Sequence, residues 1–226
     1  MKTSLKAPIV AVNFKAFSES TGKKGILLAK ICDEVAKETG ISIIVVPQTT
    51  EIRKIVETVE IPVFAQHIDA VAPGSYTGHI TAESVLEAGA SGTLINHSEC
   101  RMQIADIEAV VSKCKKAGLM SLVCTNNLPV SLACSLLKPD FVAIEPPELI
   151  GGDISVTTAD PDIVKNTVVA IKNVNRDVRV LCGAGVKDGK DLTMAIKLGT
   201  EGVLLASGIV KAKDPKKALL ELVGRR

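Results

Sequence analysis

The sequence predicts an α/β fold in which eight parallel strands, each followed by an outer helix, close into a (β/α)8 barrel. Short β-branched runs alternate with helical patterns along the 226 residues. Most of these runs are apolar without in–out alternation, which is typical of parallel strands covered on both faces. Eight such strand–helix units favour a closed barrel over an open sheet.

Eight short apolar runs are the predicted strands. In chain order they are 8–13, 41–46, 61–65, 92–95, 119–124, 140–144, 178–182 and 202–205. Val and Ile are frequent in them, and branched side chains fit a pleated sheet well. Their mean spacing of roughly 28 residues lies near the lower limit for a (β/α)8 barrel.

Amphipathic helices are predicted between the strands, because apolar residues recur there at a spacing of three or four. Six stripes carry the pattern: Leu27, Ile31 and Val35; Ile52, Ile55, Val56 and Val59; Ile104, Ile107, Val111 and Cys114; Leu128, Leu132 and Leu136; Val164, Val168 and Ile171; and Leu192, Ala195, Ile196 and Gly199. A short helix over 83–89 and a closing helix over 214–223 complete the set. Gly40, Gly118 and Gly199 fit helix ends.

The pattern runs without a linker or low-complexity tract, so residues 1–226 are expected to form a single barrel domain. A doubly wound open sheet, which is also built from alternating strands and helices, is the alternative on periodicity alone.

The composition argues against several classes of partner. A net charge of +2 provides no basic surface for nucleic acid or membrane, and one Tyr, four Phe and no Trp are too few to stack bases. No stretch approaches the roughly 18 apolar residues of a membrane span, and the apolar run 8–12 is too short for a signal peptide. We therefore expect a cytoplasmic protein that binds neither nucleic acid nor membrane.

The six cysteines are expected to be reduced thiols. None stands in a C-x-x-C pair, and several lie in apolar periodic segments, where a reduced Cys acts as a small hydrophobe. This usage fits core thiols in a reducing cytosol, and neither disulfides nor a zinc site. Cys100 and Cys182 lie near the candidate chemistry, but no sequence feature gives either thiol a base.

Polar residues follow the predicted strands, at the end of the barrel where catalytic groups are expected. Asn13 and Lys15 follow the first strand, His97 and Glu99 the fourth, and Glu145 the sixth. Glu145 can take a C–H proton beside a carbonyl, His97 can serve the oxygens, and Lys15 can offset the charge of an enediolate. Taken singly, a strand-end histidine is more often structural and a loop lysine merely solvated.

The segment 141–152, FVAIEPPELIGG, is predicted to carry a general base beneath a moving lid. Glu145 ends the strand, two prolines stiffen the next part of the chain, and two glycines at the far end permit a hinge. A carboxylate at the base of such a segment suits proton transfer under a closing loop. The alternative is a strand-terminal acid that enters an ordinary Pro-rich turn.

Two turns of small residues are predicted to cradle a phosphate. They are CGAGV at 182–186 and ASG at 206–208, after the seventh and eighth strands. Exposed backbone N–H groups bind phosphate, and barrel enzymes often place a phosphate site at these two loops. The alternative is that small residues only permit tight strand-to-helix turns.

These motifs resemble those of the triosephosphate isomerase family, and more narrowly its short archaeal form. The similar segments are VNFK at 12–15, AQH at 65–67, GSYTG at 74–78, INHSECR at 95–101, AIEPPELIGG at 143–152, CGAGV at 182–186 and LLASGIV at 204–210. They run from end to end in the family's order. Membership implies a TIM barrel that interconverts dihydroxyacetone phosphate and D-glyceraldehyde 3-phosphate through an enediolate, in glycolysis and gluconeogenesis, without metal or organic cofactor.

The resemblance also implies a role for individual residues. Glu145 would be the base, His97 the electrophile, a pairing known for that family, and Lys15 the charge stabiliser that Glu99 orients. The implied substrate-binding residues are Asn13, Lys15, Ile150, Gly151, Gly185, Ala206 and Ser207. Of these, the glycines, Ala206 and Ser207 would offer backbone N–H groups to the phosphate.

The chain departs from the family pattern mainly at the lid. Pro147 and Glu148 stand where the longer forms carry a tryptophan. Asp153 replaces a hinge glycine and adds negative charge near the expected phosphate, and Cys100 replaces an arginine common elsewhere.

Two other functions stay open on the sequence. An aldolase or a sugar-phosphate epimerase could share the phosphate-binding barrel, although a Schiff-base aldolase needs a lysine that none of the predicted strands contains. A catalytically idle barrel could serve for assembly or binding, but an intact Lys15, His97 and Glu145 argue against that.

The resemblance implies a homo-oligomer, and a tetramer for the short archaeal form. In the family, the loop that here carries Tyr76 and Thr77 inserts beside the lysine loop of a neighbouring subunit. The fourth and fifth helices would make the second contact, where Leu128, Leu132 and Leu136 present an apolar outer face.

Overall fold

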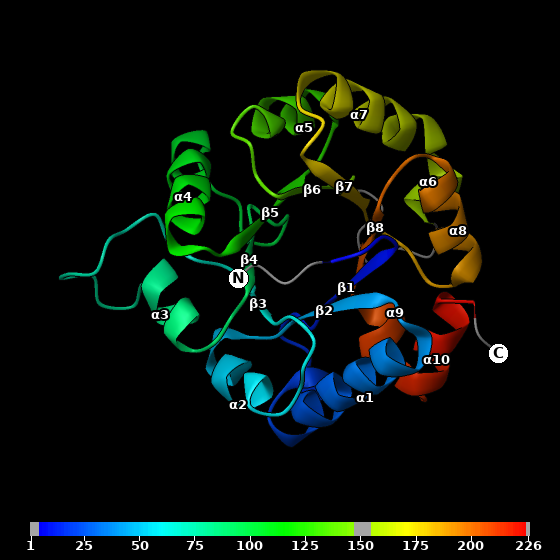
Figure 1. Cartoon of the computed structure of the whole chain (residues 1–226), viewed down its shortest axis with the longest axis horizontal. Helices are drawn as coiled ribbons and strands as arrows, with labels where there is room; N and C mark the ends of the chain where they lie inside the picture. Colours follow the sequence, from blue (N-terminus) through cyan, green and yellow to red (C-terminus); the bar gives the residue numbers. More distant parts are fainter. Residues whose placement is uncertain (1–4, 147–154, 225–226) are drawn as a thin grey trace.

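Eight parallel strands surrounded by helices form the centre of the structure (Figure 1), a computed structural model that describes residues 5–146 and 155–224. The strands are β1 Ile9–Asn13, β2 Ser42–Val46, β3 Phe64–Ala65, β4 Gly92–Ile95, β5 Met120–Thr125, β6 Phe141–Ile144, β7 Arg179–Cys182 and β8 Gly202–Leu205. Seven of them begin and end within one residue of their predicted positions, and β3 is the exception.

The sheet is a nearly closed barrel. Its strand order is β2-β1-β8-β7-β6-β5-β4-β3, so that β1 pairs with both β2 and β8. The two ends meet through a bridge between Val45 and Val63 and a 3.1 Å hydrogen bond from the Val45 N–H to the Pro62 carbonyl. The predicted barrel is therefore confirmed, and the doubly wound sheet is wrong.

β3 is shorter than the predicted run 61–65, and only Phe64 and Ala65 pair regularly with β4. Pro62 has no N–H to donate to a ladder, so regular pairing cannot extend through it.

Helices follow the strands round the outside of the barrel. They are α1 Lys23–Thr39, α2 Ile52–Val56, α3 Ala82–Glu87, α4 Ile104–Ala117, α5 Leu128–Ser135, α6 Val156–Ala159, α7 Pro161–Val174, α8 Gly189–Lys197, α9 Ser207–Val210 and α10 Pro215–Leu222. Short 3-10 turns at Ser18–Ser20 and Thr49–Glu51 precede α1 and α2. Gly40 and Gly118 end α1 and α4 in the left-handed conformation, as predicted.

Four predicted stripes do not face the core as a unit, because each has an exposed member: Leu27, Ile104, Leu136 and Ile196. On α1 Leu27 is 60% exposed, and the buried face runs instead through Leu28, Cys32 and Val35. A strict four-residue repeat drifts round a helix of 3.6 residues per turn, so Leu27 lies about 80° from Val35, at the solvent edge of the stripe. On α5 Leu136 is 61% exposed, because small residues rather than leucines meet the barrel.

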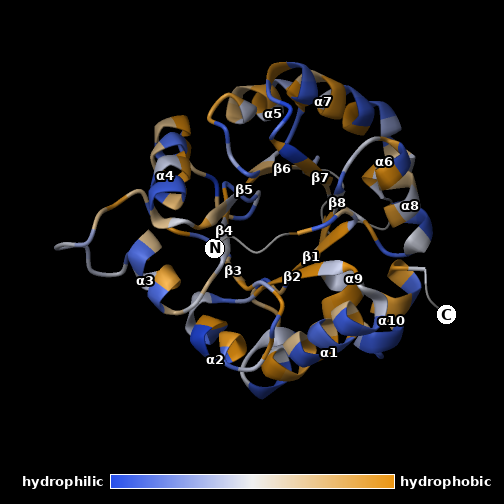
Figure 2. Ribbon diagram, viewed as in Figure 1, coloured by the Kyte–Doolittle hydropathy of each residue, from blue (hydrophilic) through white to orange (hydrophobic). Residues whose placement is uncertain are grey.

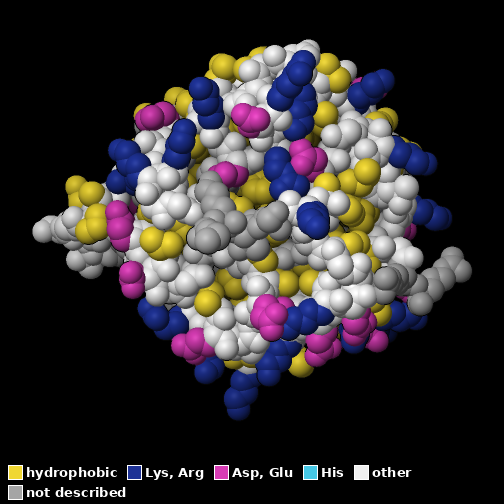
Figure 3. All heavy atoms as spheres, viewed as in Figure 1, with side chains coloured by type: hydrophobic (Ala, Val, Ile, Leu, Met, Phe, Trp, Pro, Cys, Tyr) yellow, Lys and Arg dark blue, Asp and Glu magenta, His cyan; other side chains and the backbone are white. Residues whose placement is uncertain are grey.

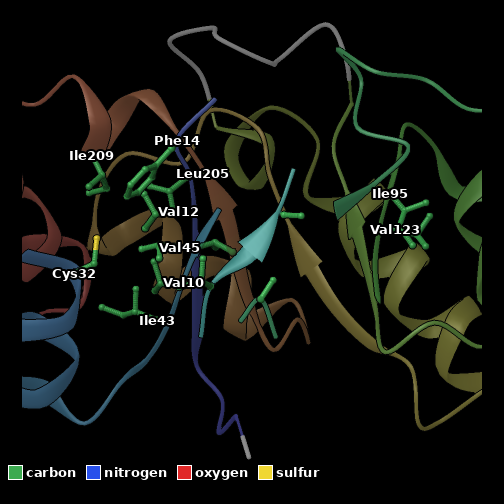
Figure 4. Packing of buried hydrophobic residues seen from close by; sticks show 14 of the residues in the cluster. Val10, Val12, Phe14, Cys32, Ile43, Val45, Ile95, Val123, Leu205 and Ile209 are labelled. Atoms are coloured by element: carbon green, nitrogen blue, oxygen red, sulfur yellow. The ribbon is translucent and has the colours of Figure 1, made fainter. Parts of the chain in front are cut away.

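Two apolar layers stabilise the fold, one inside the barrel and one between strands and helices. Neighbouring residues of β1 belong to different layers: Ile9 and Ala11 lie inside, whereas Val10 and Val12 lie outside. Figure 4 shows Val10 and Val12 pointing toward Cys32 of α1. Because both faces are buried, the strands need no polar side, which explains their continuous apolar runs.

The helices separate this core from solvent. In Figure 2 the strands are mostly hydrophobic and the helices carry both hydrophilic and hydrophobic residues. Basic and acidic side chains alternate round the face seen in Figure 3. Within 5–146 and 155–224, no helix is long and apolar enough to cross a bilayer.

Candidate active site

A cavity of about 290 Å³ lies at the carboxyl ends of the strands and collects the predicted site residues. Its lining includes Asn13, Lys15, His97, Glu99, Glu145, Gly185, Ala206 and Ser207. The structure therefore brings together residues from the loops after β1, β4, β6, β7 and β8. The other two predicted residues, Ile150 and Gly151, and the departures at 147–153 lie outside the described residues.

Glu145 follows β6 directly and is 6% exposed. Its N–H donates to the Thr125 carbonyl at 2.8 Å, which continues the β5–β6 pairing and fixes the start of the side chain. Among the described residues its Oε2 has no hydrogen-bond partner. Burial raises the pKa of this carboxyl from 4.5 to about 7, while a hydrogen bond with Cys124 and the charge of Lys15 oppose the rise. The group is therefore a carboxylate with a high affinity for a proton.

Gly183 gives this carboxylate its room. A Cβ at position 183 would lie 2.8 Å from Glu145 Oε1 and 2.7 Å from the Leu204 carbonyl oxygen. Both approaches are closer than real Cβ atoms make, so any larger residue would displace the acid or β8. The small-residue turn after β7 thus shapes the acid's position as well as the loop.

His97 is held as a neutral imidazole. Its Nδ1 accepts the Glu99 N–H at 3.2 Å, so the ring proton lies on Nε2. Burial, and then the charge of Lys15, lower the pKa of His97 from 6.5 to about 4. Nε2 lies 3.9 Å from Glu145 Oε2, which leaves a donor and an acceptor facing the same cavity.

Lys15 is positioned by its own backbone. Its backbone has a left-handed φ of 47°, and hydrogen bonds with neighbouring residues hold this conformation. Asn13 Oδ1 accepts the Lys15 N–H at 3.0 Å, and Gln66 Nε2 donates to the Lys15 carbonyl at 2.9 Å. Its Nζ forms a 2.8 Å ion pair with Glu99 Oε1. Asn13 thus acts on the lysine loop, and Glu99 contacts the lysine as predicted.

Asn96 fixes the segment that presents His97. It adopts a φ of 61°, which Asn tolerates better than most residues. Its Nδ2 donates to the Cys124 carbonyl at 3.0 Å, and its Oδ1 accepts the Met102 N–H at 2.9 Å. A polar Asn directly after a strand was a usable sequence signal for this role.

Cys124 is a site residue that sequence reasoning missed. It stands within β5, where a cysteine among apolar residues indicates packing, and only the fold brings its thiol to Glu145. The two thiols that were expected near the chemistry differ in their exposure to solvent. Cys182 is buried, which raises its pKa to about 12. Cys100 is exposed, and its Sγ lies 3.7 Å from His67 Nδ1. All six cysteines are free, and all but Cys100 are buried, as predicted for core thiols.

The opposite side of the cavity is formed by the two small-residue turns. Gly185 has a φ of 71°, which favours glycine. Within the described parts of the chain, the N–H groups of Gly185 and Ser207 have no acceptor. Lys187 and Lys211 also line this side. The arrangement provides unpaired backbone donors and positive charge for an anion.

Comparison with known proteins agrees with these motifs. The triosephosphate isomerase family model matches residues 8–130 and 128–224. The triosephosphate isomerase of Methanocaldococcus jannaschii is 54% identical over 215 residues, which cover 95% of this chain and 98% of that protein. The one from Methanobacterium bryantii is 56% identical over 220 residues, or 97% of each chain.

A solved structure shares the fold. The crystal structure of triosephosphate isomerase from Bartonella henselae matches with a TM-score of 0.76 at 20% identity, covering 95% of this chain and 98% of the other. At that identity the likeness shows the barrel alone.

Because Glu145 is buried, we expect Glu145→Gln to change the free energy of unfolding, relative to the parent, differently at two pH values. The change should be more stabilising at pH 8 than at pH 5 by about 2–3 kcal/mol. The pKa rises from 4.5 unfolded to about 7 folded, so between these values the folded state keeps a proton that the unfolded state has lost. Stability of the parent therefore falls as pH rises through this window, and the variant lacks that loss. Urea unfolding at both pH values measures it. Glu57→Gln, at an exposed carboxylate, is the control, and an equal gain at both pH values for Glu145→Gln would contradict the account.

Proposed function

The chain belongs to the triosephosphate isomerase family, and we propose that Glu145, His97 and Lys15 carry out its isomerisation. The enzyme interconverts dihydroxyacetone phosphate and D-glyceraldehyde 3-phosphate through an enediolate, in glycolysis and gluconeogenesis. One observation carries the proposal: a buried carboxylate with a pKa of about 7 lies 3.9 Å from a neutral imidazole in the same cavity. A base of that proton affinity beside a neutral donor suits proton transfer at neutral pH.

Glu145 removes a proton from the carbon next to the substrate carbonyl. The C–H electron pair becomes the double bond of the enediolate, and the carbonyl electrons move to oxygen. Glu145, now protonated, returns the proton to the neighbouring carbon. Its Oε2, which has no hydrogen-bond partner in the part of the chain that the structure describes, supports this role, because no such bond has to break before the acid accepts the proton.

His97 serves the two substrate oxygens. Its Nε2–H donates to the carbonyl oxygen as negative charge develops there, and a proton then moves between the two oxygens through the ring. A neutral ring suits this exchange, because the acidity of its Nε2–H is closer to that of an enediol hydroxyl than the acidity of an imidazolium is. Lys15 adds fixed positive charge, and its pairing with Glu99 at 2.8 Å keeps the ammonium at the cavity.

The substrate phosphate binds at Gly185, Ala206 and Ser207 in this proposal. The N–H groups of Gly185 and Ser207, which have no acceptor among the described residues, support it, because preorganised backbone donors suit a phosphate. Asn13 contributes by holding the lysine loop. Ile150 and Gly151, outside the described residues, complete the set on the strength of the resemblance. A lid that closes over the phosphate would exclude water from the enediolate.

We also propose a homotetramer with two kinds of contact. The loop from Asp69 to Ile80 extends well away from the barrel beside α3 (Figure 1), and hydrophobic side chains lie on it in Figure 3. Asp69 ties its ends together, since its Oδ2 accepts the Ile80 N–H at 2.6 Å. Tyr76 near its tip is 50% exposed. A cavity of about 420 Å³ beside Lys15 could receive such a loop from a neighbouring subunit.

The second contact would use the outer face of α4 and α5. Ile104 is 57% and Leu136 61% exposed, which leaves apolar surface on both helices. A groove of about 440 Å³ between them is lined by Ile104 and Val130 among others. Exposed apolar surface of this kind commonly marks an interface.

A cytoplasmic location is proposed as well. It rests on six cysteines that stay as free thiols, five of them in the core. Such usage fits a reducing compartment.

Glu145→Asp is expected to lower kcat about 10²-fold, because shortening the side chain by one methylene withdraws the base by roughly 1 Å. Turnover of D-glyceraldehyde 3-phosphate is measured in a coupled assay, with Glu57→Asp as the surface control. Near-full turnover by Glu145→Asp would mean that this carboxylate is not the base.

Light scattering at micromolar concentration is expected to give four times the 23.7 kDa chain mass. Tyr76→Asp and Leu136→Asp should each lower it, because each places a charge in one proposed contact. Leu27→Asp is the control, since Leu27 is equally exposed but lies on α1. A monomeric mass for the parent chain would refute the assembly.

A further inference from the structure

Lys211 is a cation of the active-site cavity that the proposed proton transfers do not use. It follows α9 directly, and its N–H donates to the Ser207 carbonyl at 3.1 Å, one helical turn back. Both residues line the cavity. Lys211 and the Ser207 turn therefore border the same space.

Phe17 holds the ammonium group of this lysine. Lys211 Nζ lies over the Phe17 ring, 4.3 Å from its centre, and Phe17 also lines the cavity. A cation over an aromatic face is attracted by the ring's quadrupole, which limits the positions that a long side chain samples. Phe17 belongs to the loop that carries Lys15, so one loop positions both cations.

The charge of Lys211 is largely available to an incoming anion. It forms no ion pair with any described residue, whereas Lys15 is paired with Glu99 at 2.8 Å. Glu19 is the acid that competes with such an anion for Lys211. Its own backbone hydrogen bond, then Ser18, and more weakly the charge of Lys211 lower the Glu19 pKa. Its carboxylate is exposed and therefore screened by solvent.

We propose that Lys211, positioned by Phe17, binds the phosphate group of the substrate as a second cation. This inference rests on the proposed phosphate position at Gly185, Ala206 and Ser207. In this proposal Lys211 contacts the phosphate equally in the bound substrate and in the transition state, so the contact lowers KM without raising kcat. Lys211 thus sets substrate affinity and capture, while Lys15 serves the enediolate.

Lys211→Met tests the proposal, because Met keeps most of the apolar stem without the charge. We expect KM and the inhibition constant of inorganic phosphate each to rise about tenfold, the size of one charge-assisted hydrogen bond, with kcat within about twofold. The dependence of phosphate inhibition on ionic strength should also weaken. Lys213→Met is the matched control, since Lys213 is an exposed lysine two residues on that does not line the cavity.

Three further variants separate charge from structure. Lys211→Arg should restore most phosphate binding, Phe17→Leu should weaken it by less than Lys211→Met, and Glu19→Gln should strengthen it slightly. An unchanged inhibition constant in Lys211→Met, or an arginine variant as weak as the methionine variant, would overturn the proposal.

Gly185→Ala distinguishes this failure from failure of the proposed phosphate position. The φ of 71° at Gly185 strains any residue with a Cβ, which would distort the turn. Weaker phosphate inhibition in Gly185→Ala, with no change in Lys211→Met, would retain the phosphate position and reject Lys211. Unchanged inhibition in both would place the phosphate elsewhere.

Discussion

Burial of the Glu145 carboxylate is the constraint on which the rest of the site depends. With 6% of the residue exposed and Oε2 unpartnered among the described residues, its charged form is costly, and its pKa rises to about 7. The two apolar layers of the barrel supply the stability that tolerates this cost. The same burial provides the proton affinity that the proposed base needs.

The surrounding groups limit the effect of burial on the pKa of Glu145 without removing it. Burial shifts the pKa of His97 downward while it shifts that of Glu145 upward, so the two groups face each other as an uncharged donor and a strong acceptor. A charged imidazole at 3.9 Å would instead stabilise the carboxylate and weaken the base. Gly183 leaves room for the acid, and the Lys15–Glu99 pair places positive charge nearby at the more exposed edge of the cavity.

The sequence predicted the barrel and the location of its chemistry because both depend on chain order. Parallel strands bring their carboxyl ends to one rim, so polar residues after strands must meet. Features that depend on three-dimensional contact were missed. In the sequence Cys124 resembles an ordinary core residue, because its contact with Glu145 exists only once β5 and β6 pair. Phe17 and Lys211 lie close together in the fold, although most of the chain separates them in the sequence. The predicted apolar face of α1 was wrong because the true face includes Cys32 and other small residues. Such residues contribute little to a pattern that is recognised by large apolar side chains.

The most direct test of the account is the pKa of Glu145 in the free enzyme, measured by NMR of 13C-labelled glutamate side chains with Glu145→Gln to assign the signal. We expect a pKa of about 7 for Glu145, and a higher pKa in Cys124→Ala, where the opposing hydrogen bond is lost. A midpoint near the ordinary 4.5 would contradict it, because the carboxylate would then be solvated or paired rather than buried as a poised base.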